Sequence, residues 1–103
     1  MSALGTEFTL NIHLEPIDGY HMEDYDFDCE FYVFAGRSVI KKKKDMIKVD
    51  KDNYTAIIEG TDAIKIGRGQ MNALVTAYVP DANFANGVRI EKRVFVCNGA
   101  KAD

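Results

Sequence analysis

Residues 25–35 read Tyr-Asp-Phe-Asp-Cys-Glu-Phe-Tyr-Val-Phe-Ala, and this stretch decides the fold. Its odd-numbered positions are all apolar, while Asp26, Asp28 and Glu30 lie between them. A period of two is that of a strand with one buried face, and aromatic residues favour strands. The stretch therefore predicts a half-buried β-strand, the strongest in the chain.

The same alternation continues on both sides of this strand. It predicts further strands at 6–14, 46–49, 54–59, 70–79 and 88–97, with turns rich in Gly, Pro, Asn and Asp between them. The charged centre of 88–97 suits an edge strand or a strand with one solvent-exposed face. Residues 61–66 predict one short helical turn, which Thr61 or Asp62 would cap and Gly67 would end.

The turn after residue 35 predicts one more strand. Gly36-Arg37 fits a two-residue type II′ turn. A hairpin closed there places Tyr32 opposite Lys41 and Glu30 opposite Lys43. Opposite charges across antiparallel strands are mildly stabilising, so the charge pattern supports this register.

About seven short strands in one chain of 103 residues predict an all-β fold. The spacing is typical of an immunoglobulin-like antiparallel β-sandwich, and a small barrel is the alternative. We expect a single domain over 1–103, with its core at about 6–97 and a flexible tail at 98–103.

The charge balance and the distribution of apolar residues argue against several classes of function. Sixteen acidic against thirteen basic residues give a net charge of −3, which argues against nucleic acid and anionic membrane as partners. No window approaches the roughly 18 apolar residues of a membrane span. The first residues lack a signal-peptide pattern, so we expect synthesis in the cytoplasm.

Two cysteines, Cys29 and Cys97, both lie in apolar runs. Neither has a second Cys or a His at metal-ligand spacing. We expect two reduced core thiols, and a disulfide between two strands stays open as the alternative.

The acidic run offers one candidate metal site. Asp24, Asp26 and Asp28 imitate the start of a calcium loop, but the Gly and Glu that complete such a loop are missing. The favoured interpretation is a solvated strand face beside the lysines of 41–44, and we expect no cofactor. Alternation splits those four lysines between two faces, and no interleaved aromatic residue offers stacking to a base.

The histidines offer little for catalysis. His13 lies on the polar face of the first strand, and His21 lies in a loop where it could pair with Asp24 for acid–base work. No Ser or Cys stands in a nucleophile motif. We therefore expect a protein that is not an enzyme.

Aromatic residues suggest a binding surface. Some of them alternate with the predicted core positions, so a sheet with only one packed face would leave them exposed. Tyr and Phe are typical interface anchors. The interface candidates are Tyr32, Phe34, Tyr78, Phe84 and Arg89.

The order of features carries a resemblance. An opening strand Phe-Thr-Leu-Asn-Ile at 8–12 is followed by a Pro and Asp-Gly loop and by the acidic aromatic strand. Then come Asp-Asn-Tyr-Thr-Ala-Ile-Ile at 52–58 and Met-Asn-Ala-Leu-Val-Thr-Ala-Tyr-Val-Pro-Asp at 71–81. Across residues 6–97 this resembles the N-terminal immunoglobulin-like domain of tailed-phage upper baseplate proteins and small prophage structural proteins. The C-terminal stalk extension of those proteins is missing.

We therefore expect a structural or assembly protein that binds other protein subunits. The resemblance implies a phage or prophage particle, with the chain as a tail, baseplate or decoration component and a homo-oligomer or larger virion assembly as its setting. Strand addition at a sheet edge is the natural mode of contact. The alternative is a carbohydrate- or cell-surface-binding module, although the chain has no Trp to stack on sugars.

Overall fold

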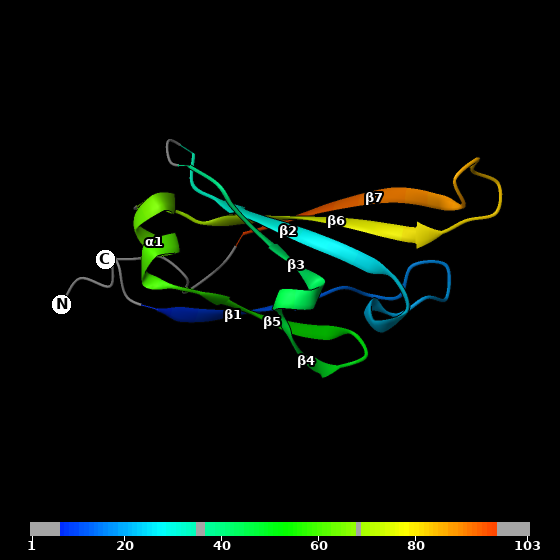
Figure 1. Ribbon diagram of the computed structural model, residues 1–103, viewed down its shortest axis with the longest axis horizontal. Coiled ribbons are helices and arrows are strands. Elements are labelled where there is room, and N and C mark those ends of the chain that lie inside the picture. Colours follow the sequence, from blue (N-terminus) through cyan, green and yellow to red (C-terminus); the bar gives the residue numbers. More distant parts are fainter. Residues whose placement is uncertain (1–6, 35–36, 68, 97–103) are drawn as a thin grey trace.

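The computed structural model describes residues 7–34, 37–67 and 69–96, and these form seven strands in two antiparallel sheets (Figure 1). The three-stranded sheet, in the order β1-β5-β4, is built from β1 (Phe8–His13), β4 (Ile47–Asp50) and β5 (Asn53–Ile58). The four-stranded sheet, in the order β3-β2-β6-β7, is built from β2 (Asp26–Tyr32), β3 (Val39–Lys42), β6 (Asn72–Pro80) and β7 (Val88–Val96). The predicted all-β sandwich is confirmed.

The chain crosses from one sheet to the other after β1, after β3 and after β5. The last crossing contains the helix α1 (Gly60–Ile66), and two 3-10 turns, Met22–Asp24 and Lys43–Asp45, lie in the other two. The strand order corresponds to strands B-E-D and C′-C-F-G of the immunoglobulin-like sandwich, without a counterpart of strand A among the described residues.

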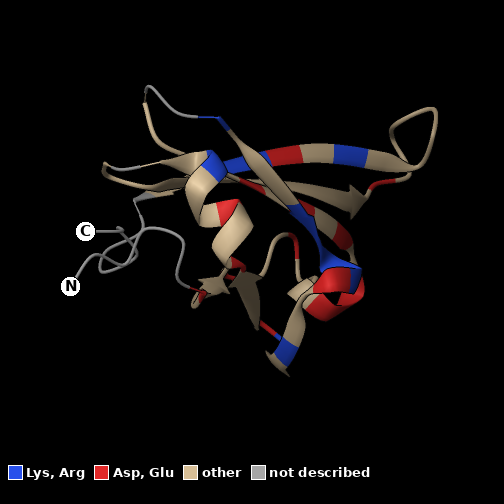
Figure 2. Ribbon diagram, turned by 60° about the vertical axis from the view of Figure 1, so that its left-hand side comes forward, with Lys and Arg blue, Asp and Glu red and all other residues tan. Residues whose placement is uncertain are grey.

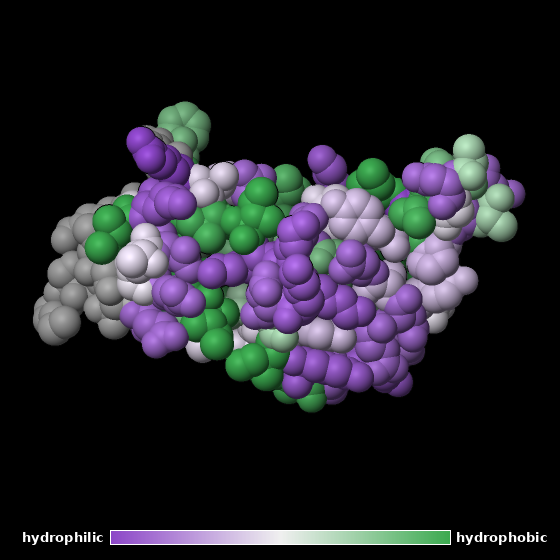
Figure 3. All heavy atoms as spheres, in the orientation of Figure 1, coloured by the Kyte–Doolittle hydropathy of each residue, from purple (hydrophilic) through white to green (hydrophobic). Residues whose placement is uncertain are grey.

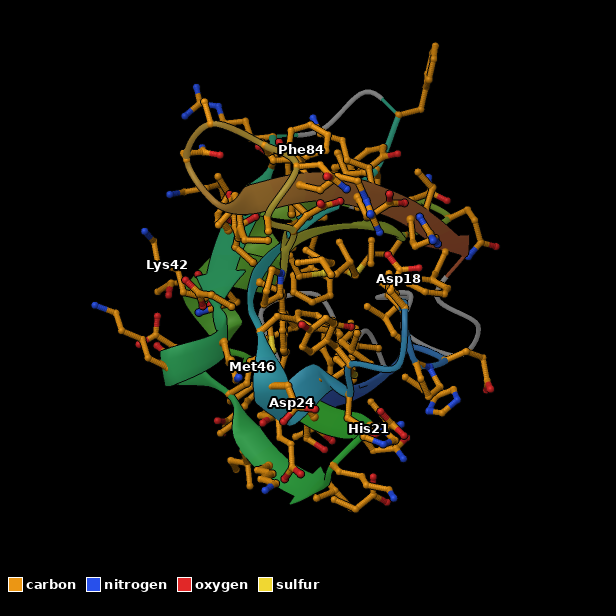
Figure 4. All side chains as sticks on the ribbon, turned by 90° about the vertical axis from the view of Figure 1, so that its right-hand side faces the viewer. Asp18, His21, Asp24, Lys42, Met46 and Phe84 are labelled. Atoms are coloured by element: carbon orange, nitrogen blue, oxygen red, sulfur yellow. The ribbon has the colours of Figure 1, made fainter. Side chains whose placement is uncertain are left out.

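The core lies between the sheets, where the predicted alternation holds. In and beside β2 the buried positions are Tyr25, Phe27, Cys29, Phe31 and Val33. In and beside β6 they are Met71, Ala73, Val75, Ala77 and Val79. Phe27 of β2 meets Tyr54 of β5 edge to face, with ring centroids 5.2 Å apart, so an aromatic pair joins the two layers. Figure 4 looks along the sandwich and shows side chains filling the space between the sheets.

The predicted two-residue hairpin between β2 and β3 is wrong. Lys41 lies opposite Cys29, not opposite Tyr32, which is a shift of three positions. An odd shift turns each side chain to the other face of the sheet. The predicted pairing of acidic residues with Lys41 and Lys43 is therefore lost, and Asp28 faces Lys42 instead.

The reason for the shift lies in the connection and in the end of β3. Strand pairing stops at Phe31 and resumes at Val39, which leaves a longer loop than the turn rule supplies. The Arg37 N–H donates to the Lys65 carbonyl of α1 at 3.4 Å, so the helix holds this loop. Lys43 leaves the strand and begins a 3-10 turn. Gly36 lies outside the described residues.

The helix is longer than predicted and begins earlier. It has seven residues, and Glu59, in an extended conformation, is its N-cap. Asp62 is at the third helical position, where its carboxylate accepts the Glu59 N–H at 3.1 Å. Gly67 ends the helix with a φ of 90°, as predicted. Asp62 also binds Lys41 of β3 at 2.7 Å, which fixes α1 against the four-stranded sheet.

Two further expectations concern membrane and thiols. Within the described residues, no helix is long and apolar enough to cross a membrane. Cys29 is fully buried in the core, as expected. Cys97 lies outside the described residues, as does the predicted tail.

Candidate functional site

The outer face of the four-stranded sheet, turned away from the core, carries a group of apolar side chains. The register and the alternation place six of them there: Tyr32, Ile40, Leu74, Tyr78, Ile90 and Val94. Ile40, Ile90 and Val94 are 59%, 56% and 62% exposed. Figure 3 shows hydrophobic side chains along the upper side of the molecule, over this sheet, interrupted by hydrophilic ones. Exposed apolar side chains gathered on one face and bordered by polar ones are typical of interaction sites.

A charged and polar row crosses the middle of the outer face. The register sets Lys42, Asp28, Thr76 and Lys92 side by side on the four strands. The Tyr78 hydroxyl donates to Asp28 at 2.9 Å, and this hydrogen bond raises the pKa of Tyr78. The apolar residues lie in bands on either side of the row. Apolar area supplies affinity and a few fixed charges supply orientation, so this face has the composition of a protein contact.

The five predicted interface candidates do not form one surface. Tyr32 and Tyr78 lie on the outer face, each half-buried. Phe34 is fully exposed in the β2–β3 loop, whereas Phe84 is 47% exposed in the β6–β7 loop. Those two loops lie at opposite ends of the molecule (Figure 1), and Figure 4 shows Phe84 at the near end. Arg89 belongs to the opposite face of β7.

Arg89 is held by carboxylates from three segments. It donates to Asp18 in the β1–β2 connection, to Asp81 at 2.7 Å in the β6–β7 loop, and to Glu91 at 2.7 Å. These hydrogen bonds, the one to Asp18 first, raise the pKa of Arg89. Asp18 projects at the open side between the sheets (Figure 4). Arg89 therefore ties the β1–β2 connection to the far sheet, which is a structural role.

The acidic residues proposed for calcium each serve a protein donor. An Asp24 oxygen accepts the His21 N–H at 2.9 Å, and an Asp26 oxygen accepts the Phe27 N–H at 2.9 Å. Asp28 accepts from Tyr78, as described above. Within residues 7–34, 37–67 and 69–96, no group of three or more His, Cys, Asp or Glu side chains could hold a metal ion. The structure does not bring the three aspartates together around a common point.

The two histidines converge on Asp52, in the turn between β4 and β5. His21 Nδ1 lies 2.9 Å from an Asp52 carboxylate oxygen, and His13 Nδ1 lies 3.0 Å from the Asp52 carbonyl oxygen. His13 Nε2 also contacts Glu15 at 2.7 Å, which raises the pKa of His13. The pairing of the His21 ring with Asp24, considered from the sequence for acid–base work, is not formed, because the Asp24 carboxylate accepts the His21 backbone N–H. The histidines thus fasten two loops to one turn.

Lys43 has a similar role at the β1–β2 connection, directly after His21. Its Nζ donates to the carbonyl oxygens of Met22, Glu23 and Tyr25 at 3.0, 3.1 and 2.7 Å. The same ammonium lies 5.7 Å from the centroid of the Tyr54 ring. Burial lowers the pKa of Lys43. The sequence predicted Glu30 as the cross-strand partner of Lys43. In the structure Lys43 instead binds backbone carbonyl oxygens and holds the β1–β2 connection in place.

Sequence reasoning missed Ile40 and Ile90 on the outer face. The signal for Ile90 was present, because Val88, Ile90 and Val94 alternate with charged residues along β7. Ile40 follows from no local pattern, since its face depends on the β2–β3 register.

The chain matches no protein family, no curated protein and no solved structure with significance. What the molecule does must therefore follow from its own surface.

Proposed function

We propose that this protein is a non-enzymatic structural or adaptor module that binds another protein subunit through the outer face of its four-stranded sheet. The observation that carries the proposal is the exposure of Ile40, Ile90 and Val94 on one face with three half-buried apolar neighbours. Leaving such side chains in water forgoes about 25 cal/mol for each Å² of apolar area that a partner would cover.

The chemistry of the polar groups supports binding over catalysis. Arg89, Lys43 and His21 are each engaged by groups of this chain that hold loops in place. Their geometry is that of structural clamps, with each donor directed at a carboxylate or carbonyl oxygen.

The decisive experiment compares two isoleucines of similar exposure. Ile40→Lys places a charge on the outer face opposite Glu30, where a lysine is compatible with the strand pair. The control Ile64→Lys also introduces a positive charge, but on α1, away from the outer face. Ile64 is 62% exposed, which matches the exposure of Ile40. Both variants should unfold at the wild-type denaturant concentration.

The three chains are then immobilised and exposed to an extract of the cells that make the protein. The wild type and Ile64→Lys should retain the same bound subunit, and Ile40→Lys should lose it. If Ile40→Lys retains it equally, the outer face is not the contact surface.

A narrower form of this proposal places the module in a phage or prophage particle, as a tail, baseplate or decoration component. The resemblance to baseplate domains in the order of sequence features across residues 6–97 supports it. The prediction is that purified particles contain the chain in a fixed ratio to the major tail protein. Particles assembled without it would disprove the assignment.

A second candidate is a carbohydrate-binding module. An open groove on the outer face is lined by Asp26, Phe27, Asp28, Lys42, Lys44 and Tyr78. Carboxylates, ammonium groups and a phenol are suitable partners for sugar hydroxyls. A glycan array decides the matter: hits that disappear in Asp28→Ala would favour this function, and an array without hits would dispose of it.

A further inference from the structure

The strand β7 offers an open edge along its full length. It pairs with β6 from Asn72–Val96 to Pro80–Val88, and among the described residues no strand lies on its other side. An edge strand presents unpaired backbone donors and acceptors, which can accept another strand. In Figure 1, β7 runs along the upper border of the molecule.

The sequence of β7 is complementary to itself when it is read in the opposite direction. An antiparallel pair of two β7 strands centred on Lys92 joins residues whose numbers add up to 184. Ile90 then faces Val94 of the second copy, and Glu91 faces Arg93 of the second copy. Each of these pairs occurs twice, because a two-fold axis through Lys92 repeats it. Figure 2 shows basic and acidic positions along β7, with one uncharged position between the first basic and the acidic one and a further basic stretch directly after it.

Neighbouring registers lack this complementarity. A shift that centres the pair on Glu91 sets Glu91 against Glu91 and Arg89 against Arg93. A shift that centres it on Arg93 sets Arg93 against itself and Lys92 against Val94. Each of the three registers sets one charged residue against its own copy, which is destabilising, but only the register centred on Lys92 adds two pairs of opposite charge, between Glu91 and Arg93. The register centred on Lys92 also pairs all nine residues of the strand, whereas each shift of this kind leaves residues unpaired.

The exposure of the side chains fits the same register. Ile90 and Val94, more than half exposed, lie on the outer face, where each would cover the other across the new strand pair. Glu91 and Arg93 lie on the opposite face, 27% and 46% exposed, already in contact at 3.0 Å within one chain. The charge pair across the axis would extend this contact. Lys92 alone meets its own copy, at the two-fold axis.

We propose that two copies of this chain join through antiparallel pairing of their β7 strands, centred on Lys92, to form one continuous eight-stranded sheet. The inference goes beyond the proposed function, because the second copy joins at the β7 edge and leaves the outer face open to another subunit. It extends the outer face across the two-fold axis, so that the apolar bands of both copies become one surface.

A cysteine scan within one strand tests the register. In a Cys97→Ser background, Lys92→Cys would bring its Cα about 4.5–5.5 Å from that of its own copy, within disulfide range. Ile90→Cys is the matched control on the same face, because residue 90 lies about 13 Å from its own copy in this register. Under mild oxidation, Lys92→Cys should form the disulfide dimer at least about tenfold faster than Ile90→Cys does.

A second variant tests the same axis without a cross-link. Lys92→Thr removes the like-charge contact, so it should lower the Kd of dimerisation about two- to fivefold in sedimentation equilibrium. Lys42→Thr, on the opposite edge strand, should leave that Kd unchanged. A substitution that merely disturbed the fold would not strengthen dimerisation. A gain in affinity in Lys92→Thr therefore shows that Lys92 lies in the dimer contact.

The outcomes separate this inference from the proposed function. A wild-type dimer with fast cross-linking at position 92 and slow cross-linking at position 90 supports the β7 pair. A dimer that cross-links equally fast at position 90 overturns the β7 register. A dimer that dissociates to monomers in Ile40→Lys but not in the β7 variants also overturns it, and leaves the outer face as the contact. A monomer at all concentrations without preference for position 92 overturns self-pairing, and the capture experiment with Ile40→Lys then decides the proposed function alone.

Discussion

Tyr25 combines a buried ring with an unpaired hydroxyl. The side chain packs in the core, 4% exposed, and within the described residues its oxygen has no hydrogen-bond partner. A buried hydroxyl without a partner has lost its water contacts without compensation. Tyr25→Phe should therefore raise the free energy of unfolding by about 1 kcal/mol in urea denaturation. Tyr20→Phe, at an exposed tyrosine, should leave it unchanged, and a loss of stability in Tyr25→Phe would show that the hydroxyl has a partner.

The same residue predicts a loss of stability in alkali. Burial raises the pKa of Tyr25 from 10.0 to about 12. The folded state thus holds the proton more tightly than the unfolded chain does. Its contribution is complete below pH 10 and is lost as the pH rises towards about 12. Unfolding midpoints measured across this range should fall, and they should fall less in Tyr25→Phe. Identical slopes in the two proteins would contradict the assignment.

Single residues also show what sequence patterns can reach. The inward positions of β2 and β6 were predicted correctly because a period of two directly reflects burial on one face. The partners of His21 and Lys43 were not, because Asp52 and the Met22 carbonyl come from segments remote in sequence. Local patterns carry no information about such contacts.

At the scale of elements, the β2–β3 connection shows how a local rule loses to tertiary structure. Gly36-Arg37 suits a tight turn, but the loop is held by α1, and the lysines that would extend β3 bend into a 3-10 turn. Lys43 gains three carbonyl acceptors by this bend, which cross-strand pairing with Glu30 could not supply. The apolar outer position of Ile40 is a consequence of the resulting register.

The clamp formed by Lys43 predicts a specific loss. Lys43→Met keeps the apolar stem but leaves the carbonyl oxygens of Met22 and Tyr25 without their donor. The free energy of unfolding should fall by about 2 kcal/mol, as for hydrogen bonds to a charged group. Lys44→Met, at the exposed neighbouring lysine, is the control for loss of charge. Equal denaturation midpoints for the two variants would show that the clamp contributes nothing.

At the scale of the whole molecule, the strands could be predicted, but local patterns did not assign them to the two sheets. Turn spacing and alternation predicted about seven strands, and the structure has seven in its described residues. The charged centre of the last strand fitted an edge strand or a strand with one solvent-exposed face, and β7 lies at an edge. The candidate interface was predicted only in part. Tyr32 and Tyr78 share the outer face, whereas Phe34 and Phe84 lie on loops at opposite ends, whose places depend on the packing of the sheets.

Arg89 joins segments that belong to both sheets, and its substitution should therefore act on the whole fold. It connects β7 in one sheet to the connection that leaves β1 in the other, through Asp18, and also to the β6–β7 loop through Asp81. A guanidinium serves three carboxylates because its donors form a planar fork, which an ammonium cannot imitate. Arg89→Ala should lower Tm by several degrees and increase hydrogen exchange in residues 15–20 and 81–87 together.

Arg89→Lys is the matched control, because it retains the charge and loses the fork. It should recover only part of the lost Tm, with exchange in one of the two segments still raised. If Arg89→Ala left both the Tm and the hydrogen exchange unchanged, the three contacts would be surface ion pairs that do not contribute to stability. Arg89, first predicted from the sequence as an interface residue, would then again be available for a partner. If the Tm falls and the hydrogen exchange increases as expected, a loss of binding in Arg89→Ala reports on the fold, and Ile40 remains the residue that reports on the contact.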